Sequence, residues 1–239
     1  MTVDQPPPLP GSRNAAGGLW CEILTGDFEN RPALFLDRDG VIIEDTHYLG
    51  RAEDVRFLTG ATQAIARCNR LDIPVVLVSN QSGIARGLYD WDGFQSVQSA
   101  LAALLTNDGA HLDAVFACAY HADGNAPLNV ADHPWRKPNP GMIVAAGERM
   151  KLDLSRSWIV GDRASDIAAG RGARLEGGIL VSGRGHDPEH LSARALQAEG
   201  FVVDFSASLA DAVTLLLSRG CFGLGASSGP AKAAARPPL

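Results

Sequence analysis

The chain has 239 residues, of which 46% are hydrophobic and 20% charged, and its formal net charge is −6 at pH 7. This composition excludes a disordered acidic chain, and no apolar run approaches the roughly 20 residues of a membrane-spanning helix. With 21 Lys and Arg against 27 Asp and Glu and no basic stripe, polymeric nucleic acid is not expected as a partner.

The two ends of the chain differ from its middle. Residues 1–18 and 221–239 are rich in proline, glycine and small residues, so we expect a disordered N-terminal extension, a folded domain over 19–220 and a flexible C-terminal tail. The N-terminus lacks the basic and then apolar layout of a secretion signal, and the four scattered cysteines form no C-x-x-C pair. A cytoplasmic protein with reduced thiols is expected.

Short apolar runs alternate with amphipathic stretches along the middle of the chain. They predict strands at 33–37, 74–79, 113–120, 157–162, 178–182 and 201–204. Helices are predicted at 61–71, 94–109, 140–152, 166–173 and 208–220. Because bounded apolar runs suit strands that are covered on both faces, the pattern predicts an α/β fold with a doubly wound parallel sheet, interrupted by an irregular insertion at 121–140.

Polar side chains close the predicted strands. Asp37 ends the first strand and Asp39 follows two residues later, Ser79 ends the second and Asp162 ends the fourth. Lys137 lies near the end of the long insertion, just before a helix. Because ligands of open parallel sheets bind beyond the carboxyl ends of the strands, we expect these side chains to form one site.

The two acids after the first strand indicate phosphate chemistry. Asp37 and Asp39 are two residues apart, and Gly40 lets the chain turn away after them. One carboxylate of such a pair can attack phosphorus, and the other can protonate the leaving oxygen and then activate water. The pair therefore predicts hydrolysis of a phosphate ester through a phosphorylated aspartate.

Such a reaction brings negative charge next to carboxylates, so the site needs a hard divalent cation, for which magnesium is suited. Asp162 and Asp166, in the pattern G-D-x-x-x-D, supply a second pair of carboxylates. Ser79 can hydrogen-bond a phosphoryl oxygen, and Lys137 can neutralise the charge on the group that is transferred.

Each feature alone has an ordinary structural explanation. Asp-x-Asp pairs are common in turns, Ser79 could cap a helix, Asp162 could lie in a loop, and Lys137 could be a solvated surface charge. Their order along the chain, each at a strand end or helix start of one predicted sheet, favours a catalytic site.

This order resembles a known superfamily. L-D-R-D-G-V, V-S-N-Q-S-G, R-K-P-N-P-G and V-G-D-R-A-S-D-I are similar to the four signature motifs of the haloacid dehalogenase (HAD) superfamily of phosphohydrolases. The resemblance implies a Rossmann-like fold with little or no separate cap. It implies Asp37 as the nucleophile, Asp39 as the general acid and base, and Ser79 and Lys137 as the pair that stabilises the phosphoryl group.

The resemblance also implies ligands for Mg²⁺. These would be the Asp37 carboxylate, the main-chain carbonyl of Asp39 and the Asp162 carboxylate, with Asp166 in support.

Within the superfamily, F-L-D-R-D-G-V-I, S-N-Q-S-G-I-A-R-G and R-K-P-N-P-G-M resemble the branch of the heptose 1,7-bisphosphate and histidinol-phosphate phosphatases. That resemblance implies substrate contacts from Asp45, Thr46, His47, Tyr48, Asn80, Gln81, Ser82, Arg86, Arg136 and Arg163. The arginines suit a bisphosphate, because a guanidinium can bind a second phosphate with two parallel hydrogen bonds. For Arg86 a surface loop and for His47 a packing role remain alternatives.

The chain departs from this branch at a structural zinc site. Many members carry C-x-H and then C-x-C before R-K-P, but here only Cys118 is in register. A rearranged site from Cys118, His121 and His133, with Asp132 as a further candidate ligand, stays an alternative to a loop without zinc. In a loop without zinc, packing of Tyr120 and Trp135 would order the chain in place of the metal. Tyr120 belongs to the segment C-A-Y-H and Trp135 to the segment H-P-W.

The leading hypothesis is a magnesium-dependent monomeric phosphatase that removes the C7 phosphate from D-glycero-D-manno-heptose 1,7-bisphosphate. Histidinol phosphate or another small phosphomonoester is the alternative substrate. A receiver-like phosphoacceptor and a non-catalytic binding protein are the alternatives from other classes. Asp39 argues against a receiver, because an acid and base next to the nucleophile shortens the life of a phosphoaspartate.

Overall fold

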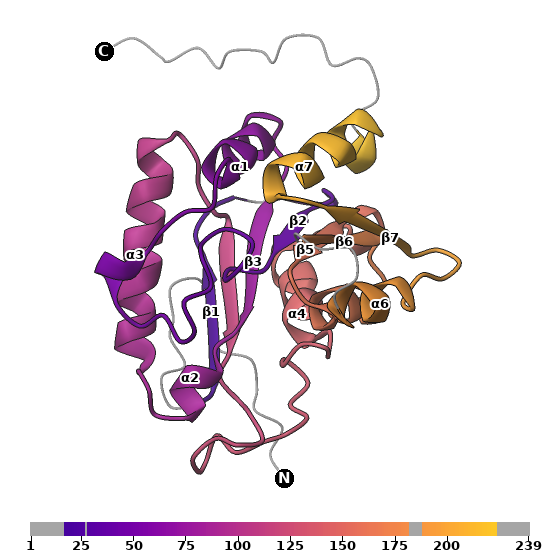
Figure 1. Cartoon of the computed structure of the whole chain (residues 1–239). Helices are drawn as coiled ribbons and strands as arrows, with labels where there is room; N and C mark the ends of the chain where they lie inside the picture. Colours follow the sequence, from indigo (N-terminus) through magenta and orange to yellow (C-terminus); the bar gives the residue numbers. More distant parts are fainter. Residues whose placement is uncertain (1–16, 27, 182–187, 224–239) are drawn as a thin grey trace.

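A computed structural model describes residues 17–26, 28–181 and 188–223 of the chain (Figure 1). Its seven strands are β1 (Leu19–Ile23), β2 (Leu34–Leu36), β3 (Val75–Asn80), β4 (Ala114–Cys118), β5 (Trp158–Gly161), β6 (Gly177–Val181) and β7 (Val202–Ser206). The α-helices are α1 (Ala61–Arg70), α2 (Ser82–Ala85), α3 (Trp91–Asn107), α4 (Gly141–Met150), α5 (Ala164–Gly172), α6 (Pro188–Arg194) and α7 (Leu209–Ser218). Short 3-10 helices are η1 (Ala52–Asp54), η2 (Leu154–Arg156) and η3 (Cys221–Gly223).

The strands form one sheet in the order β1-β4-β3-β2-β5-β6-β7. From β2 in the centre the chain builds outward through β3 and β4, and then returns to place β5 on the other side of β2. All pairings from β4 to β7 are parallel, which confirms the predicted doubly wound sheet. Only β1, which was not predicted, runs antiparallel, on β4 at the edge.

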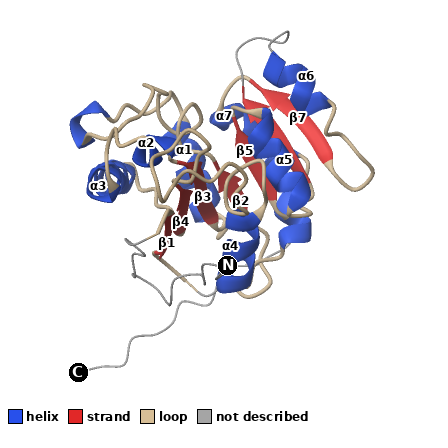
Figure 2. Cartoon of the chain, turned by 90° about the horizontal axis from the view of Figure 1, so that it is seen from below, coloured by secondary structure: helices blue, strands red, loops and turns tan. Residues whose placement is uncertain are grey.

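Helices cover both faces of the sheet (Figure 2). The alternation of β2 shows the reason, because Leu34 and Leu36 face the core under α1, α3 and α7, whereas Phe35 faces the core under α4, α5 and α6. Burial on both faces requires the near-continuous apolar runs from which the strands were predicted.

The folded part continues beyond the predicted domain end at residue 220. Cys221–Gly223 form η3, and Phe222 is only 6% exposed in the core beneath α7. The predicted tail therefore begins three residues too early, because the burial of one aromatic side chain orders this turn. Residues 1–16 and 224–239 lie outside the described part of the chain.

Two long connections lie at the carboxyl edge of the sheet. Residues 37–60 follow β2 and contain only η1, and residues 119–140 follow β4 without a helix or strand, as predicted for the insertion. All described helices and strands belong to the sheet, to its two helix layers or to these connections, without a separate cap domain. In the described part of the chain no helix has the length and apolarity to cross a membrane.

Candidate active site

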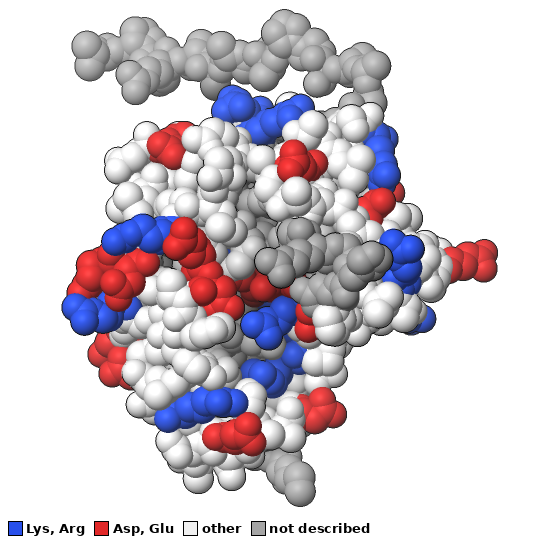
Figure 3. Space-filling model, in the orientation of Figure 1, with Lys and Arg blue, Asp and Glu red and all other residues white. Residues whose placement is uncertain are grey.

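A cavity of about 730 Å³ opens at the carboxyl ends of β2, β3 and β5. Acidic and basic side chains lie side by side near the middle of this face of the molecule (Figure 3). Most of the residues selected from the sequence line the cavity: Asp37, Asp39, Asp45, His47, Tyr48, Ser79, Asn80, Gln81, Ser82, Arg86, Arg136, Lys137, Arg163 and Asp166. The fold therefore brings together segments that are up to 129 positions apart, from 37 to 166.

Two selected residues are not part of that lining. Thr46 lines a neighbouring cavity beside Arg51 and Leu88, so the structure does not place it with the catalytic group. Asp162 is not among the lining residues, but its carboxylate is within 4.8 Å of those of Asp37 and Asp166.

The turn after β2 packs closely against Asp162. Gly40 has φ +78°, and a Cβ atom at this position would lie 2.6 Å from Oδ2 of Asp162. Only glycine provides both this backbone conformation and this close approach. The main-chain N–H groups of Ile42 and Ile43 donate to the Arg38 carbonyl at 3.0 and 3.1 Å, which closes the turn.

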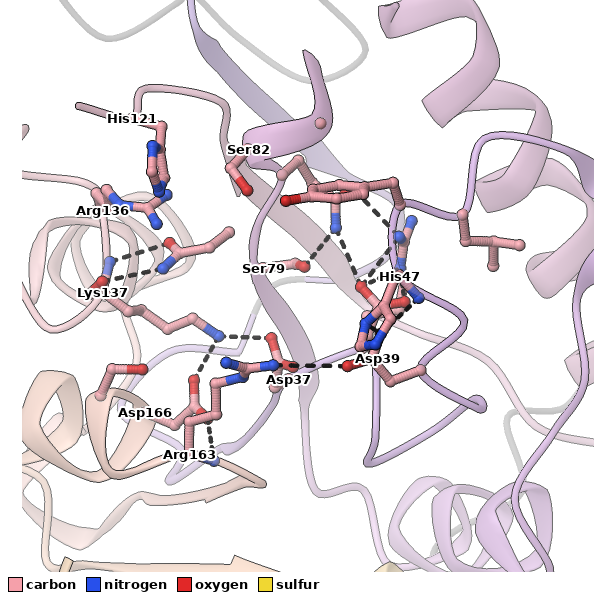
Figure 4. Close-up of a pocket in the computed structure, with 18 of the residues that line it drawn as sticks. Asp37, Asp39, His47, Ser79, Ser82, His121, Arg136, Lys137, Arg163 and Asp166 are labelled. Carbon is pink, nitrogen blue, oxygen red and sulfur yellow. Dashed lines mark hydrogen bonds and ion pairs between the residues drawn. The ribbon is translucent and has the colours of Figure 1, made fainter. Parts of the chain in front are cut away.

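The ammonium of Lys137 lies between two carboxylates (Figure 4). Its Nζ is 2.5 Å from Oδ1 of Asp37, 2.6 Å from Oδ1 of Asp166 and 2.8 Å from the Val78 carbonyl oxygen. Burial alone would lower the pKa of Lys137, but the two carboxylates together raise it above its usual value. Lys137 is therefore a fixed cation at the nucleophile.

Negative charge nevertheless exceeds positive charge in this part of the site. Burial raises the pKa of Asp37 to about 8, and the neighbouring carboxylates add to the rise against the opposing charge of Lys137. Burial also raises the pKa of Asp162 to about 7, with Asp166 as a further cause. These carboxyl groups hold protons tightly because they are buried and because the charges of Lys137 and of Arg163, 4.0 Å from Asp162, do not balance the three acids; a divalent cation would remove that excess.

The cluster of Asp37, Asp162 and Asp166 fits such a cation. Oxygen is the ligand that Mg²⁺ prefers, and the three carboxylates offer oxygens within 4.8 Å of one another. Oδ1 of Asp162 is buried and has no hydrogen-bond partner. A buried carboxylate oxygen of this kind is costly unless something binds it, so the donor set and its unsatisfied atom both fit a bound metal.

Asn80 ties the end of β3 to the loop that carries the lysine. Its Nδ2 donates to the Lys137 carbonyl at 2.9 Å, and its Oδ1 accepts from the Lys137 main-chain N–H at 3.0 Å. This pair of hydrogen bonds uses one donor and one acceptor of the amide to hold the lysine backbone.

A buried polar network surrounds Asp39 and Ser79. Arg38, which is 1% exposed, donates to Asp39 from Nε at 3.2 Å and from Nη2 at 3.1 Å. The Gln81 amide connects the network, since Nε2 donates to Ser79 Oγ at 2.7 Å and Oε1 accepts from Arg38 and from Tyr89. These contacts within the protein fix the Asp39 carboxylate and the Ser79 hydroxyl.

Basic side chains occupy another part of the cavity wall. Arg86 and Arg136 come from different loops. His121 lies beside Arg136 (Figure 4), and it also contacts Arg86. Arg86 contacts His121 at 3.3 Å and Asp123 at 3.2 Å, and Nη1 of Arg136 donates to the Tyr120 carbonyl at 3.0 Å. Burial, with both arginines close by, lowers the pKa of His121. The positive charge here therefore belongs to the two guanidinium groups.

The loop after β2 forms the remaining rim. The Arg163 guanidinium is 3.5 Å from the Asp45 carboxylate, which also accepts from the His47 main-chain N–H at 3.0 Å. The His47 side chain itself is 84% exposed, so it does not have the packing role considered as an alternative. Arg86 lies over the Tyr48 ring at 5.8 Å and is therefore not a free surface residue.

The candidate zinc residues have other neighbours. Cys118 is fully buried in β4, His121 contacts Arg86, and His133 stacks on Tyr120 with 4.1 Å between ring centroids. Trp135 packs on Phe116 at 5.8 Å. Tyr120 thus packs on the insertion and Trp135 packs on β4, so both aromatic side chains contribute packing as expected, and the absence of zinc stays a prediction.

The cavity also contains residues that the sequence did not single out, or not for this purpose. Arg38, Tyr89 and Ser165 line it, and so does His121, which was considered only as a zinc ligand. Of these residues only Arg38 could have been found from the sequence, because it stands between the two predicted catalytic acids. Tyr89 and His121 lie in irregular segments, where no periodicity shows which way a side chain points.

Comparisons with known proteins agree with this geometry. A family model described as HAD-hydrolase-like matches residues 134–209. A relative from Mesorhizobium japonicum, named D-glycero-beta-D-manno-heptose-1,7-bisphosphate 7-phosphatase, is 45% identical over 194 residues, which cover 80% of this chain and 89% of the relative.

Two solved structures are similar in fold. A HAD-like protein from Mesorhizobium loti is 42% identical, with a TM-score of 0.74 and coverage of 84% of this chain and 94% of that chain. The D,D-heptose 1,7-bisphosphate phosphatase from B. bronchiseptica, in complex with magnesium and phosphate, is 30% identical, with a TM-score of 0.64 and coverage of 79% and 99%. The resemblance seen in the four motifs is confirmed: the chain belongs to the family of the heptose-1,7-bisphosphate 7-phosphatases, which are phosphoric monoester hydrolases of the HAD superfamily.

Proposed function

We propose that this protein is a magnesium-dependent phosphatase that removes the C7 phosphate from D-glycero-D-manno-heptose 1,7-bisphosphate through an aspartyl-phosphate intermediate. The observation that carries the proposal is one cavity that holds both the Asp37 and Lys137 pair and the two guanidinium groups of Arg86 and Arg136. In a substrate with two phosphates, one phosphate can bind at the Asp37 and Lys137 pair and the other at the two guanidinium groups.

The reaction uses Asp37 and Asp39 in turn. A carboxylate oxygen of Asp37 forms a bond to phosphorus while the bond from phosphorus to the C7 oxygen breaks, and Asp39 gives that oxygen its proton. Asp39 then takes a proton from water, whose oxygen attacks phosphorus and breaks the bond to Asp37. Inorganic phosphate leaves and both carboxylates are restored.

Ser79 and Lys137 stabilise the group in transfer. Lys137 places a positive charge 2.5 Å from the attacking carboxylate, and Ser79 offers a hydroxyl from the end of the neighbouring strand. Positioned donors and charges of this kind stabilise the charge that spreads over the phosphoryl oxygens.

The Asp37 and Asp162 carboxylates, the Asp39 main-chain carbonyl and, in support, Asp166 would hold Mg²⁺. When bound, the ion neutralises charge between the nucleophile and the phosphoryl group. The loop after β4 would need no zinc, because aromatic packing orders it.

The rest of the substrate would meet the other walls of the cavity. Arg86 and Arg136 would bind the C1 phosphate, and Asp45, His47, Tyr48 and Ser82, which line the same cavity, would contact the sugar hydroxyls. Arg163, which lies beside Asp162, would also contact the substrate.

We also propose a monomer in the cytoplasm. The described chain supplies both sets of groups without a second copy, and its four cysteines are unpaired, as in a reducing compartment. The partner would then be the small phosphorylated sugar alone.

The test is phosphate release with Mg²⁺ from both anomers of the bisphosphate, histidinol phosphate and several sugar monophosphates. Because the relative from M. japonicum is named for the beta anomer, we expect that anomer to have the highest specificity constant, by about a hundredfold over the monophosphates. A preference for histidinol phosphate, or a flat profile, would remove the heptose assignment. Stable phosphorylation without turnover would indicate a receiver-like phosphoacceptor instead.

A further inference from the structure

Gln81 was expected to contact substrate, but its amide is occupied by the protein. The residue follows β3 directly and is 2% exposed. Its Oε1 accepts from Nη2 of Arg38 at 3.1 Å and from the Tyr89 hydroxyl at 2.5 Å. Its Nε2 donates to Ser79 Oγ at 2.7 Å and lies 3.4 Å from Oδ2 of Asp39.

Chemistry allows only one orientation of this amide. A guanidinium has donors and no acceptor, so the group that faces Arg38 must be the amide oxygen. Rotation by 180° would place the amide nitrogen against the donors of a buried cation, and it would take one of its two acceptors from Nη2 of Arg38, which would keep only Asp39. Arg38 thereby fixes Nε2 toward Ser79.

The orientation of the amide determines what the Ser79 hydroxyl can do. A hydroxyl has one proton to donate, and its oxygen here already accepts from Gln81. Within the described part of the chain the Ser79 proton has no acceptor of its own, and Ser79 lines the cavity. The proton is therefore available to an oxygen that enters the cavity.

We infer that Gln81 is a positioning residue, which keeps the Ser79 hydroxyl as a hydrogen-bond donor to the phosphoryl group in transfer. The inference rests on the proposed phosphatase chemistry. It assigns to Gln81 an action through Ser79 in place of a contact with the sugar.

The sharpest variant is Gln81→Glu. A glutamate keeps the acceptors for Arg38 and Tyr89 but has no donor, so its second oxygen would accept the Ser79 proton and turn it away from the phosphoryl group. We expect kcat to fall by about tenfold to a hundredfold, on p-nitrophenyl phosphate as well as on the bisphosphate, with a smaller change in KM. Wild-type turnover of p-nitrophenyl phosphate shows whether the phosphatase chemistry itself holds, independently of Gln81.

Gln81→Met is the matched comparison. Methionine is similar in length but neither donates nor accepts, so the Ser79 proton stays free and the expected loss is smaller than with glutamate. If Gln81 only contacted the substrate or only held its neighbours in place, methionine, which has no hydrogen-bonding group, would reduce kcat more than glutamate does. A greater loss with methionine than with glutamate would overturn the inference.

The decisive measurement repeats both substitutions in Ser79→Ala. If Gln81 acts through Ser79, the factor by which Gln81→Glu reduces kcat should be at least about threefold smaller in that background, where only the effect of the new carboxylate on Asp39 remains, since neighbours that act together are not additive. The same factor in both backgrounds would contradict the inference. Thermal unfolding of each variant with Mg²⁺ identifies any variant that fails to fold. The values of kcat are then compared only between variants that fold.

Discussion

At the scale of single residues, the nucleophile occupies a position that is unfavourable for a charged group. Asp37 is buried, and the pKa that burial raises to about 8 shows how strongly the metal-free site favours its protonated form. Lys137 already opposes this rise, and a bound cation would offset the remainder. The protonation of Asp37 therefore responds to metal binding at the site.

Asp37→Asn should reduce magnesium-dependent phosphate release by at least about a thousandfold, because an amide cannot form the aspartyl phosphate. The amide is nearly isosteric and removes one charge from the carboxylate cluster. The unfolding temperature of the metal-free variant should therefore equal or exceed that of the wild type at about pH 8. Activity that survives the substitution would refute the assignment of the nucleophile.

Arg136→Ala should separate bisphosphate from monophosphate substrates. A hydrogen bond from a guanidinium to phosphate contributes about 1.5–3 kcal/mol, so kcat/KM for the bisphosphate should fall by about tenfold to a hundredfold. p-Nitrophenyl phosphate, which has no second phosphate, should be affected far less. Arg171→Ala, on the exposed side of α5, is the matched control and should leave the ratio unchanged. Equal losses on both substrates for Arg136→Ala would show a structural role.

At the scale of elements, the turn after β2 links fold and site. Gly40→Ala would bring a methyl group to 2.6 Å from Oδ2 of Asp162 and strain the backbone. Gly109, with φ +68° and nothing within 4 Å of its added methyl group, offers the same strain without the contact. We expect both variants to lose about 1 kcal/mol of unfolding free energy from the backbone conformation, but only Gly40→Ala to lose most of its activity and Mg²⁺ affinity. Similar activity in the two variants would show that the approach to Asp162 is unimportant.

Much of the element order could be predicted from the sequence, because buried parallel strands must be apolar throughout and their ends are polar. The misses have physical causes. β1 is a short edge strand next to the proline-rich N-terminus, and α2 and α6 are too short for a clear period. α3 begins at Trp91, earlier than predicted, because the Asp90 carboxylate accepts from the Gly93 N–H and caps it.

Within the site, the residues that end strands could be predicted and the residues that orient them could not. Asp37 and Ser79 follow apolar runs, so their position at the sheet edge can be deduced from the sequence alone. Arg38 would point away from Asp39 if the strand alternation continued, but the tight turn lets it fold back on that carboxylate. Tyr89 reaches Gln81 only through tertiary structure.

At the scale of the whole molecule, the return of the chain from β4 to β5 places the two acidic motifs on neighbouring strands. This couples metal binding to the stability of the fold, because the cluster exists only when β2 and β5 are paired. The coupling depends on pH, since protons and Mg²⁺ compete for the same carboxylates.

Stability should respond to pH in a direction that the pKa values set. Asp37 and Asp162 have pKa values of about 8 and about 7 in the folded protein, above the ordinary value of 3.8. Their protonated forms therefore stabilise the metal-free fold fully below about pH 3.8, and this contribution is lost as the pH rises to about 8. Mg²⁺ binds the deprotonated forms, so the gain in unfolding free energy on adding Mg²⁺ should grow from about pH 5.5 to about pH 8.5. Urea unfolding with and without Mg²⁺ measures it, and a gain that shrinks with rising pH would contradict the proposed ligands.

The central claim is tested most directly by ³¹P NMR of the reaction with D-glycero-D-manno-heptose 1,7-bisphosphate and Mg²⁺. The account predicts that the C7 phosphate resonance disappears, one equivalent of inorganic phosphate appears and the C1 phosphate resonance remains, with no change in the Asp37→Asn sample. Loss of the C1 phosphate first, or no turnover by a folded wild-type protein, would contradict it.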